Sequence, residues 1–225
     1  LSIAASLSSG IKANFGADTK PMHAGHCNRS GLMAALLAEQ GFTAGAATFE
    51  GPQGYLNVYN GEGNYDVGPL TSDWFLPPKL LVPGVSIKQF PCCGSTHSAI
   101  YAAMALARED AVNAGDVEQV DVLVHPRRLP HTNKPRPQTP LEAKFSIQYV
   151  TARALLDGQV RAEHFEGAAY AQESVSALTA RVNAQATEQF AAETPHGFAA
   201  RVSVSLKDGR SIVREYMEEP GRGPG

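Results

Sequence analysis

The sequence has few cysteines, a small net charge and no long apolar run. Three cysteines among 225 residues are too few for the disulfide framework of a small secreted domain, so we expect a reducing, cytoplasmic compartment. No apolar segment approaches the roughly 20 residues that a membrane helix requires, and the first residues lack the pattern of a signal peptide. The net charge of −3 argues against nucleic-acid or membrane-surface binding, because those partners attract a broad basic surface. Any positively charged site must therefore be local.

Several catalytic signatures are also missing. The chain has no Gly-rich phosphate loop, no Gly-x-Ser-x-Gly elbow and no Cys-x-x-Cys pair. Cys92 and Cys93 are adjacent, which favours buried small side chains over an iron–sulfur or nucleophilic role. His23 and His26 form a His-x-x-His pair without an intervening acid, unlike helical zinc sites. We therefore expect neither a metal nor a cofactor.

Helical spacing dominates the first 44 residues. An apolar residue at every fourth position predicts a short helix within residues 1–16. Thr19 as an N-cap and Pro21 in the first turn predict a second helix over residues 21–40. The side chains expected to face a core on this helix are Met22, Met33, Leu36 and Leu37.

The composition changes near residue 45, where we expect a domain boundary. Residues 51–83 are rich in glycine, proline, asparagine and aromatics, including Trp74 and Phe75, and predict an ordered irregular segment. The start at Leu1 and the Gly- and Pro-rich end over residues 220–225 lead us to expect a chain cut from something longer at both ends.

The remainder of the chain mixes strands and helices. Alternating patterns predict strands over residues 85–90 and 117–125, a hairpin over 198–217 and a further neighbouring strand within 182–190. Helices are expected over residues 95–115 (with Ser95 as N-cap), 141–158, 162–165 and 173–181. These elements do not alternate as regular βαβ units, so the predicted fold class is α+β.

Three stretches gather cations. At the start of the long helix, Lys20, His23, His26 and Arg29 share one edge, where the helix dipole favours an anion; a solvated helix edge explains them equally well. In residues 88–97, a strand end leads into a helix start. There Lys88 could hold a carboxylate and the dipole would lower the pKa of His97, or both could be local surface groups.

The third stretch is a proline-stiffened basic loop over residues 126–140. Its cationic and titratable side chains are Arg127, Arg128, His131, Lys134 and Arg136. The loop is either a clamp over the same anion or a solvated basic segment.

Five blocks of the sequence resemble signatures of the MmgE/PrpD family. They stand in the family's order and extend over nearly the whole chain. They are residues 13–16 (Ala-Asn-Phe-Gly), 19–25 (Thr-Lys-Pro-Met-His-Ala-Gly), 50–55 (Glu-Gly-Pro-Gln-Gly-Tyr), 88–91 (Lys-Gln-Phe-Pro) and 141–149 (Leu-Glu-Ala-Lys-Phe-Ser-Ile-Gln-Tyr).

The resemblance implies both an architecture and an activity. The family includes 2-methylcitrate dehydratase, cis-aconitate decarboxylase and an iminodisuccinate epimerase, which act on small polycarboxylates without an obligatory metal. Its members have a large all-helical domain and a smaller α+β lid, with the active site between them, usually in a homodimer. Residues 1–44 are then expected to be part of the helical domain. Residues 45–225 are expected to be the lid, with a small, mainly antiparallel sheet packed on helices.

Individual residues carry the resemblance further. Lys20 and His23 match the family's Thr-Lys-Pro-x-His motif and Lys88 matches its lysine before Phe-Pro, which implies that they carry substrate carboxylates. His97 matches a histidine of the decarboxylase branch. Cys93 stands where that branch has an active-site histidine, a departure that argues against decarboxylation of cis-aconitate.

His131 is a second departure, because the decarboxylase branch has a tyrosine there. Residues and resemblance together indicate a metal-independent, dehydratase-like lyase that abstracts an α-proton from a polycarboxylate such as 2-methylcitrate. In this hypothesis Lys20 and Lys88 bind carboxylates, and the catalytic histidines are His23, His97 and His131. The alternatives are an epimerase or isomerase, a decarboxylase, or a non-catalytic fragment that serves ligand binding or dimerisation.

Overall fold

The chain forms two compact units, Leu1–Pro78 and Lys79–Gly225. The computed structural model describes residues 1–72, 76–78, 80–82, 84–193 and 197–217; Trp74, Phe75 and residues 220–225 lie outside this range. The division falls later than the composition change at residue 45, because the Tyr59 hydroxyl donates a hydrogen bond of 3.0 Å to the Ser8 carbonyl. The assignment of residues 1–44 to a helical domain and of 45–225 to a lid stays a prediction.

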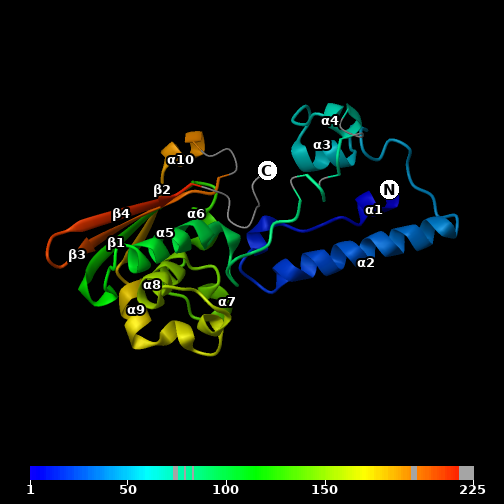
Figure 1. Ribbon diagram of the computed structural model, residues 1–225. Coiled ribbons are helices and arrows are strands. Elements are labelled where there is room, and N and C mark those ends of the chain that lie inside the picture. Colours follow the sequence, from blue (N-terminus) through cyan, green and yellow to red (C-terminus); the bar gives the residue numbers. More distant parts are fainter. Residues whose placement is uncertain (73–75, 79, 83, 194–196, 218–225) are drawn as a thin grey trace. The chain divides into compact units, whose positions relative to one another are not determined.

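Unit 1 consists of one long helix and several short helical elements (Figure 1). Its elements are α1 (Ser2–Ser6), the 3-10 turn η1 (Lys12–Asn14), α2 (Thr19–Glu39), α3 (Tyr55–Asn60) and α4 (Gly68–Ser72). A short helix lies within residues 1–16 as predicted, but it ends at Ser6, and Gly10, with a φ of +128°, separates it from η1. The N-cap prediction is wrong: Thr19 is the first residue of α2, and Asp18 precedes it.

Three of the four large apolar side chains predicted to face a core on α2 are exposed, and the fourth, Leu37, is half-buried. Met22 and Leu36 are 60% and 52% exposed, and Met33 is exposed as well. The residues of α2 that are buried are the small ones, Ser30 and Ala34. Helical spacing predicted the helix correctly, but it did not predict which of its side chains are buried.

Unit 2 is built on a four-stranded sheet with the order β2-β1-β3-β4. The strands are β1 (Val117–Val124), β2 (Val182–Ala186), β3 (Ala200–Leu206) and β4 (Ser211–Tyr216). β1 pairs in parallel with β2, whereas β1–β3 and β3–β4 are antiparallel. The predicted hairpin is confirmed, and Gly209 has a φ of +87° in its turn, a conformation that favours glycine. The α+β class with a mainly antiparallel sheet is therefore correct.

Two helices cover one face of this sheet (Figure 1), α5 (His97–Arg108) and α8 (Ile147–Asp157). The inward valines of neighbouring strands pair in register, as Val120 with Val204 and Val122 with Val202, and all four are buried. This period-two burial explains why the strand pattern could be predicted. The remaining helical elements of unit 2 are η2 (Gly94–Thr96), η3 (Ala114–Asp116), α6 (Leu129–Thr132), α7 (Pro140–Ala143), η4 (Ala162–Phe165), η5 (Ala169–Ala171), α9 (Glu173–Thr179) and α10 (Glu188–Glu193).

Several predicted boundaries in unit 2 are wrong. Residues 85–90 are irregular instead of a strand, and no β partner supports them in the described part of the chain. Helix α5 begins at His97 after the turn η2, so Ser95 is not its N-cap. The helix predicted over residues 141–158 is divided into α7 and α8, because the Ser146 hydroxyl accepts a hydrogen bond from the Tyr149 N–H (3.0 Å) and begins a new helix. The strand predicted within residues 182–190 ends at Ala186 and gives way to α10.

Within the described residues, the structure has no helix that is both long and apolar enough to cross a lipid bilayer.

Candidate functional site

The segment from Lys88 to His97 folds back on itself at the entrance to α5. The exposed Lys88 donates a hydrogen bond of 2.9 Å from Nζ to the carbonyl of Cys92. The Cys93 N–H donates to the carbonyl of Lys144 (2.8 Å), which attaches the turn to the end of α7. The segment is thus irregular instead of a strand, but one side-chain and one backbone hydrogen bond fix its position in unit 2.

His97 lies inside the core beneath this turn. Its side chain is 1% exposed, and its ring meets the Phe90 ring edge-on, with centroids 5.1 Å apart. Burial, followed by the charge of Lys88, lowers the pKa of His97 to about 4, so the imidazole is neutral near pH 7. Its buried Nε2 has no hydrogen-bond partner among the described residues. The sequence predicted a neutral ring, but desolvation, rather than the helix dipole, is the leading cause.

Cys92 is also part of this core. It is 4% exposed, and burial raises the pKa of its thiol to about 12. A thiol with such a pKa is not a nucleophile near neutral pH, which agrees with the expected role as a small buried side chain.

His131 lies on α6, in the basic loop, and meets the turn before α5. The His131 Nε2 and the Ser95 Oγ are 3.0 Å apart, and both side chains are half-buried. The structure therefore brings the basic loop against the segment that begins at Lys88. Sequence analysis predicted both stretches as parts of one site, but it missed the contact between them, because it assigned Ser95 to helix capping.

The basic loop is more constrained than a solvated cationic segment. Arg128 donates from Nε to the carbonyl of Gly197 (2.8 Å) and stacks its guanidinium 3.9 Å from the centroid of the Phe198 ring. The Arg127 N–H donates to Nδ1 of the buried His125 (3.0 Å). At least part of the predicted clamp thus serves the fold.

Lys20 and His23 belong to unit 1. Lys20 Nζ lies 5.2 Å from the centroid of the Phe15 ring, a favourable cation–π geometry. A Cβ atom added at Gly10 would come within 3.3 Å of the His23 ring, so the ring packs against this backbone. Because the two units are described separately, a site that combines these residues with Lys88 stays a prediction.

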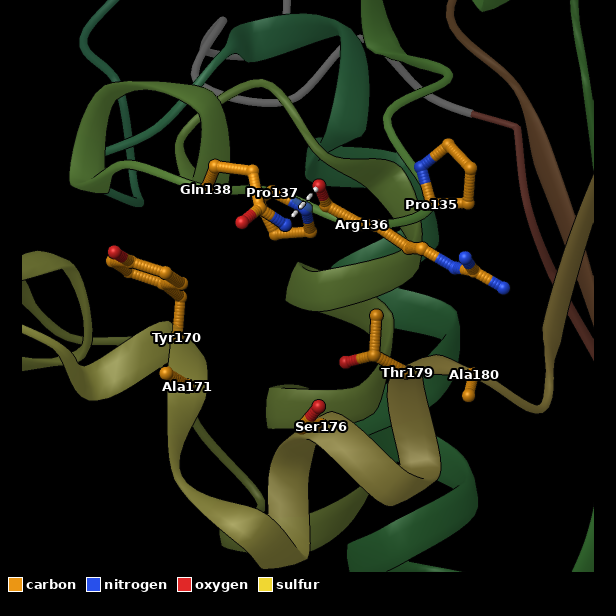
Figure 2. A pocket seen from close by; sticks show the side chains of 9 residues that line it. All are labelled: Pro135, Arg136, Pro137, Gln138, Tyr170, Ala171, Ser176, Thr179 and Ala180. Carbon is orange, nitrogen blue, oxygen red and sulfur yellow. Dashed lines mark hydrogen bonds between the residues drawn. The ribbon is translucent and has the colours of Figure 1, made fainter.

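A pocket of about 280 Å³ lies between the Pro-rich loop and α9. Figure 2 shows the hydroxyls of Ser176 and Thr179 on one side of it and Gln138 on the other, while the Arg136 side chain runs away from those hydroxyls. Its described lining contains neither a histidine nor a carboxylate. For proton transfer, the contact between His131 and Ser95 is the better candidate, with Lys88 in the segment that leads to Ser95.

Metal ligands do not gather in the described residues. No three side chains of histidine, cysteine, aspartate and glutamate lie together there in a way that could hold an ion.

Comparisons with known proteins identify the same family as the five sequence blocks. The MmgE/PrpD N-terminal domain model matches residues 1–67 and the MmgE/PrpD C-terminal domain model matches residues 90–224. The chain is 30% identical over 224 residues to a cis-aconitate decarboxylase of Homo sapiens, covering 95% of this chain and 44% of that protein. The corresponding enzyme of Mus musculus is 28% identical over 222 residues, with 95% and 44% covered. That of Aspergillus terreus is 25% identical over 229 residues, with 93% and 45% covered. The chain thus spans less than half the length of these relatives.

Proposed function

Because the chain belongs to the MmgE/PrpD family, we propose that the protein is a lyase that acts on a small di- or tricarboxylate. The observation that carries the proposal is the contact between Ser95 and His131, 3.0 Å, at a turn whose preceding segment carries the exposed Lys88, bonded to the Cys92 carbonyl. Abstraction of a proton α to a carboxylate needs a cation that stabilises the developing negative charge and a base that is neutral before it acts. Lys88 and His131 supply these two kinds of group.

The roles follow from charge and access. Lys88 is exposed and uses one hydrogen bond to the Cys92 carbonyl, so its ammonium group has donors left for a substrate carboxylate. His131 transfers a proton, because its ring is half-buried instead of enclosed. His97 supports the turn as a neutral core ring, and its predicted catalytic role requires the turn to open. Lys20 and His23 are proposed to bind or orient the carboxylates from the helical side.

Dehydration and decarboxylation remain the two reactions to separate. In dehydration the proton leaves the carbon α to a carboxylate and hydroxide leaves the adjacent carbon, so an alkene forms. In decarboxylation the bond to a carboxyl carbon breaks, CO2 leaves and a proton is added to the remaining carbon. The curated relatives carry the name cis-aconitate decarboxylase, whereas Cys93 and His131 favour a dehydratase-like reaction, with 2-methylcitrate as the first substrate to test. We further propose a cytoplasmic homodimer.

A substrate panel tests this proposal. The complete protein is offered citrate, 2-methylcitrate, cis-aconitate and related polycarboxylates, while alkene absorbance and released CO2 are followed together. Alkene formation without CO2 supports a dehydratase, and CO2 release supports a decarboxylase. Exchange of an α-hydrogen with solvent, without either product, favours an epimerase. If the protein reacts with no member of the panel, the remaining hypothesis is a non-catalytic module that serves ligand binding or dimerisation.

A matched pair of lysines tests the site. Lys88→Ala is expected to lower kcat/KM by about 10- to 100-fold, because one charge-assisted contact with the substrate is lost. Lys207→Ala is the control, since Lys207 Nζ also donates to a backbone carbonyl, that of Gly115 (2.6 Å), but on the hairpin turn. Equal activity of the two variants removes Lys88 from the site.

A further inference from the structure

We propose that Ser95 is a positioning residue that holds the His131 imidazole while this ring takes up and releases a proton. The proposal rests on the proposed function and adds a residue to it. The Ser95 Oγ and the His131 Nε2 are 3.0 Å apart. They come from η2 and α6 and are 36 positions apart in the sequence, so the contact joins two distant segments.

The serine side of this contact is anchored to its surroundings. The Thr96 hydroxyl donates to the carbonyl of Cys93 (2.8 Å), and the Cys93 N–H donates to the carbonyl of Lys144 (2.8 Å). Thr96 itself is fully buried. The Ser95 hydroxyl is therefore presented from a turn that is tied on both sides.

The histidine side is held by α8. The side chain of Gln148, 2% exposed, donates from Nε2 to Asn133 Oδ1 (2.6 Å) and accepts at Oε1 from the Lys134 N–H (3.2 Å). The Ser146 hydroxyl donates to the Lys134 carbonyl (2.6 Å). The residues directly after His131 are thus attached to a core helix, which limits movement of the ring away from Ser95.

A hydroxyl is suited to a ring that changes its protonation state. When Nε2 carries no proton, the Ser95 hydroxyl can donate to it, and when Nε2 is protonated, the same oxygen can accept. A carboxylate in this place would stabilise the charged ring specifically and raise its pKa. The hydrogen bond between Ser95 and His131 can therefore persist while the ring gains and loses a proton. It favours neither the neutral nor the charged ring strongly.

The charged groups on the surrounding segments are mostly positive. Lys88 lies on the serine side, Arg128 and Lys134 flank His131 on its own loop, and α7 carries Glu142 and is followed by Lys144. Two further titratable rings belong to these segments: His97 is neutral near pH 7, and burial lowers the pKa of His125 directly before the basic loop.

Three substitutions at position 95 test the proposal in the complete protein. Ser95→Ala is expected to lower kcat about 10-fold with KM changed less than about twofold, because substrate binding persists while the ring loses its hold. Ser95→Thr keeps the hydroxyl and should retain kcat within about threefold. Ser95→Asp should move the acidic limb of the kcat/KM profile upward by about one pH unit. Ser176→Ala, which removes an exposed hydroxyl at the pocket beside α9, is the control for loss of a serine hydroxyl.

Unchanged kcat and an unchanged pH profile in Ser95→Ala would overturn the proposal, as would equal losses in the alanine and threonine variants. Histidine NMR separates this result from a failure of the proposed function. If the wild-type protein converts no polycarboxylate, the proposed function fails, but the ring-nitrogen shifts of His131 between pH 5 and 9 still test the contact. Ser95→Ala should change them, and identical titrations in the two proteins would remove Ser95 as a partner of the ring.

Discussion

Unit 1 and unit 2 both contain long helices, but they differ in what those helices bury. Ala34 is the only buried hydrophobic residue in the described part of unit 1, whereas unit 2 holds the rest of the described core. α8 is nearly covered, with nine of its residues buried, whereas α2 buries Ser30 and Ala34 in 21 residues. Local propensity thus suffices to form a helix, but burial depends on partners that the local sequence does not specify.

Substitution of two leucines, one in each unit, is the strongest test of the difference in burial between the units. Leu106 in α5 is fully buried and Leu36 in α2 is 52% exposed. Leu106→Ala should lower the free energy of unfolding by about 3 kcal/mol, because it removes packed methyl groups and leaves a cavity. Leu36→Ala should change it by less than about 0.5 kcal/mol. Urea unfolding followed by circular dichroism measures both, and equal losses would show that α2 is covered as well as α5.

A pair of arginines makes a similar test with polar groups. Arg153, 5% exposed, donates to the Tyr149 hydroxyl (3.0 Å), the Ala169 carbonyl (2.8 Å) and Asp157 (3.2 Å). Arg153→Ala should cost about 2 to 3 kcal/mol in unfolding free energy, since it leaves these acceptors without their donor.

Arg161 is the control for this change. Its guanidinium is 3.6 Å from Glu163, and both side chains are more than half exposed. Arg161→Ala should cost less than about 0.5 kcal/mol. If the two arginine variants unfold at the same urea concentration, the hydrogen bonds of Arg153 stabilise the fold no more than the surface ion pair of Arg161 does.

The buried imidazole of His97 makes the stability of unit 2 depend on pH. Its pKa is lowered to about 4 in the folded protein, against an ordinary value near 6.5 in the unfolded chain. Below pH 6.5 the unfolded chain binds the proton first, so stability is complete above that pH and falls as the pH decreases towards 4. The loss should reach about 2 to 3 kcal/mol at pH 4.5. In His97→Gln the urea midpoint should depend less on pH over this range, and an equal dependence in both proteins would contradict the assignment.

The parts of the fold that followed from the sequence are those with a strong local signal. The alternating valines of β1 and β3 and the turn at Gly209 gave the hairpin and the central strand, and Gly158, with a φ of +63°, ended α8 as expected. Residues 85–90 alternate in the same way but form no strand, because alternation cannot supply a neighbouring strand. Ser146 divided a periodic segment through one hydrogen bond, which periodicity does not reveal.

For the candidate site, the sequence identified residue types better than their partners. It predicted that Lys88, His97 and His131 contribute to one region, and the structure places all three in unit 2 near the turn before α5. It did not predict that Ser95 contacts His131, since the contact joins distant loops. It also could not predict how deeply His97 is buried, because that depends on Phe90 and the core around it.

A glycine in α2 gives the smallest test of the comparison between the units. A Cβ atom added at Gly31 meets no atom within 4 Å, and glycine lowers helix stability by roughly 0.5 to 1 kcal/mol relative to alanine. Gly31→Ala should therefore raise the stability of α2 by up to about that amount, seen as a higher melting midpoint in far-UV circular dichroism. A fall in stability would mean that another surface packs closely against this position. That outcome would place α2 with the covered helices of unit 2 and remove the contrast between the two units.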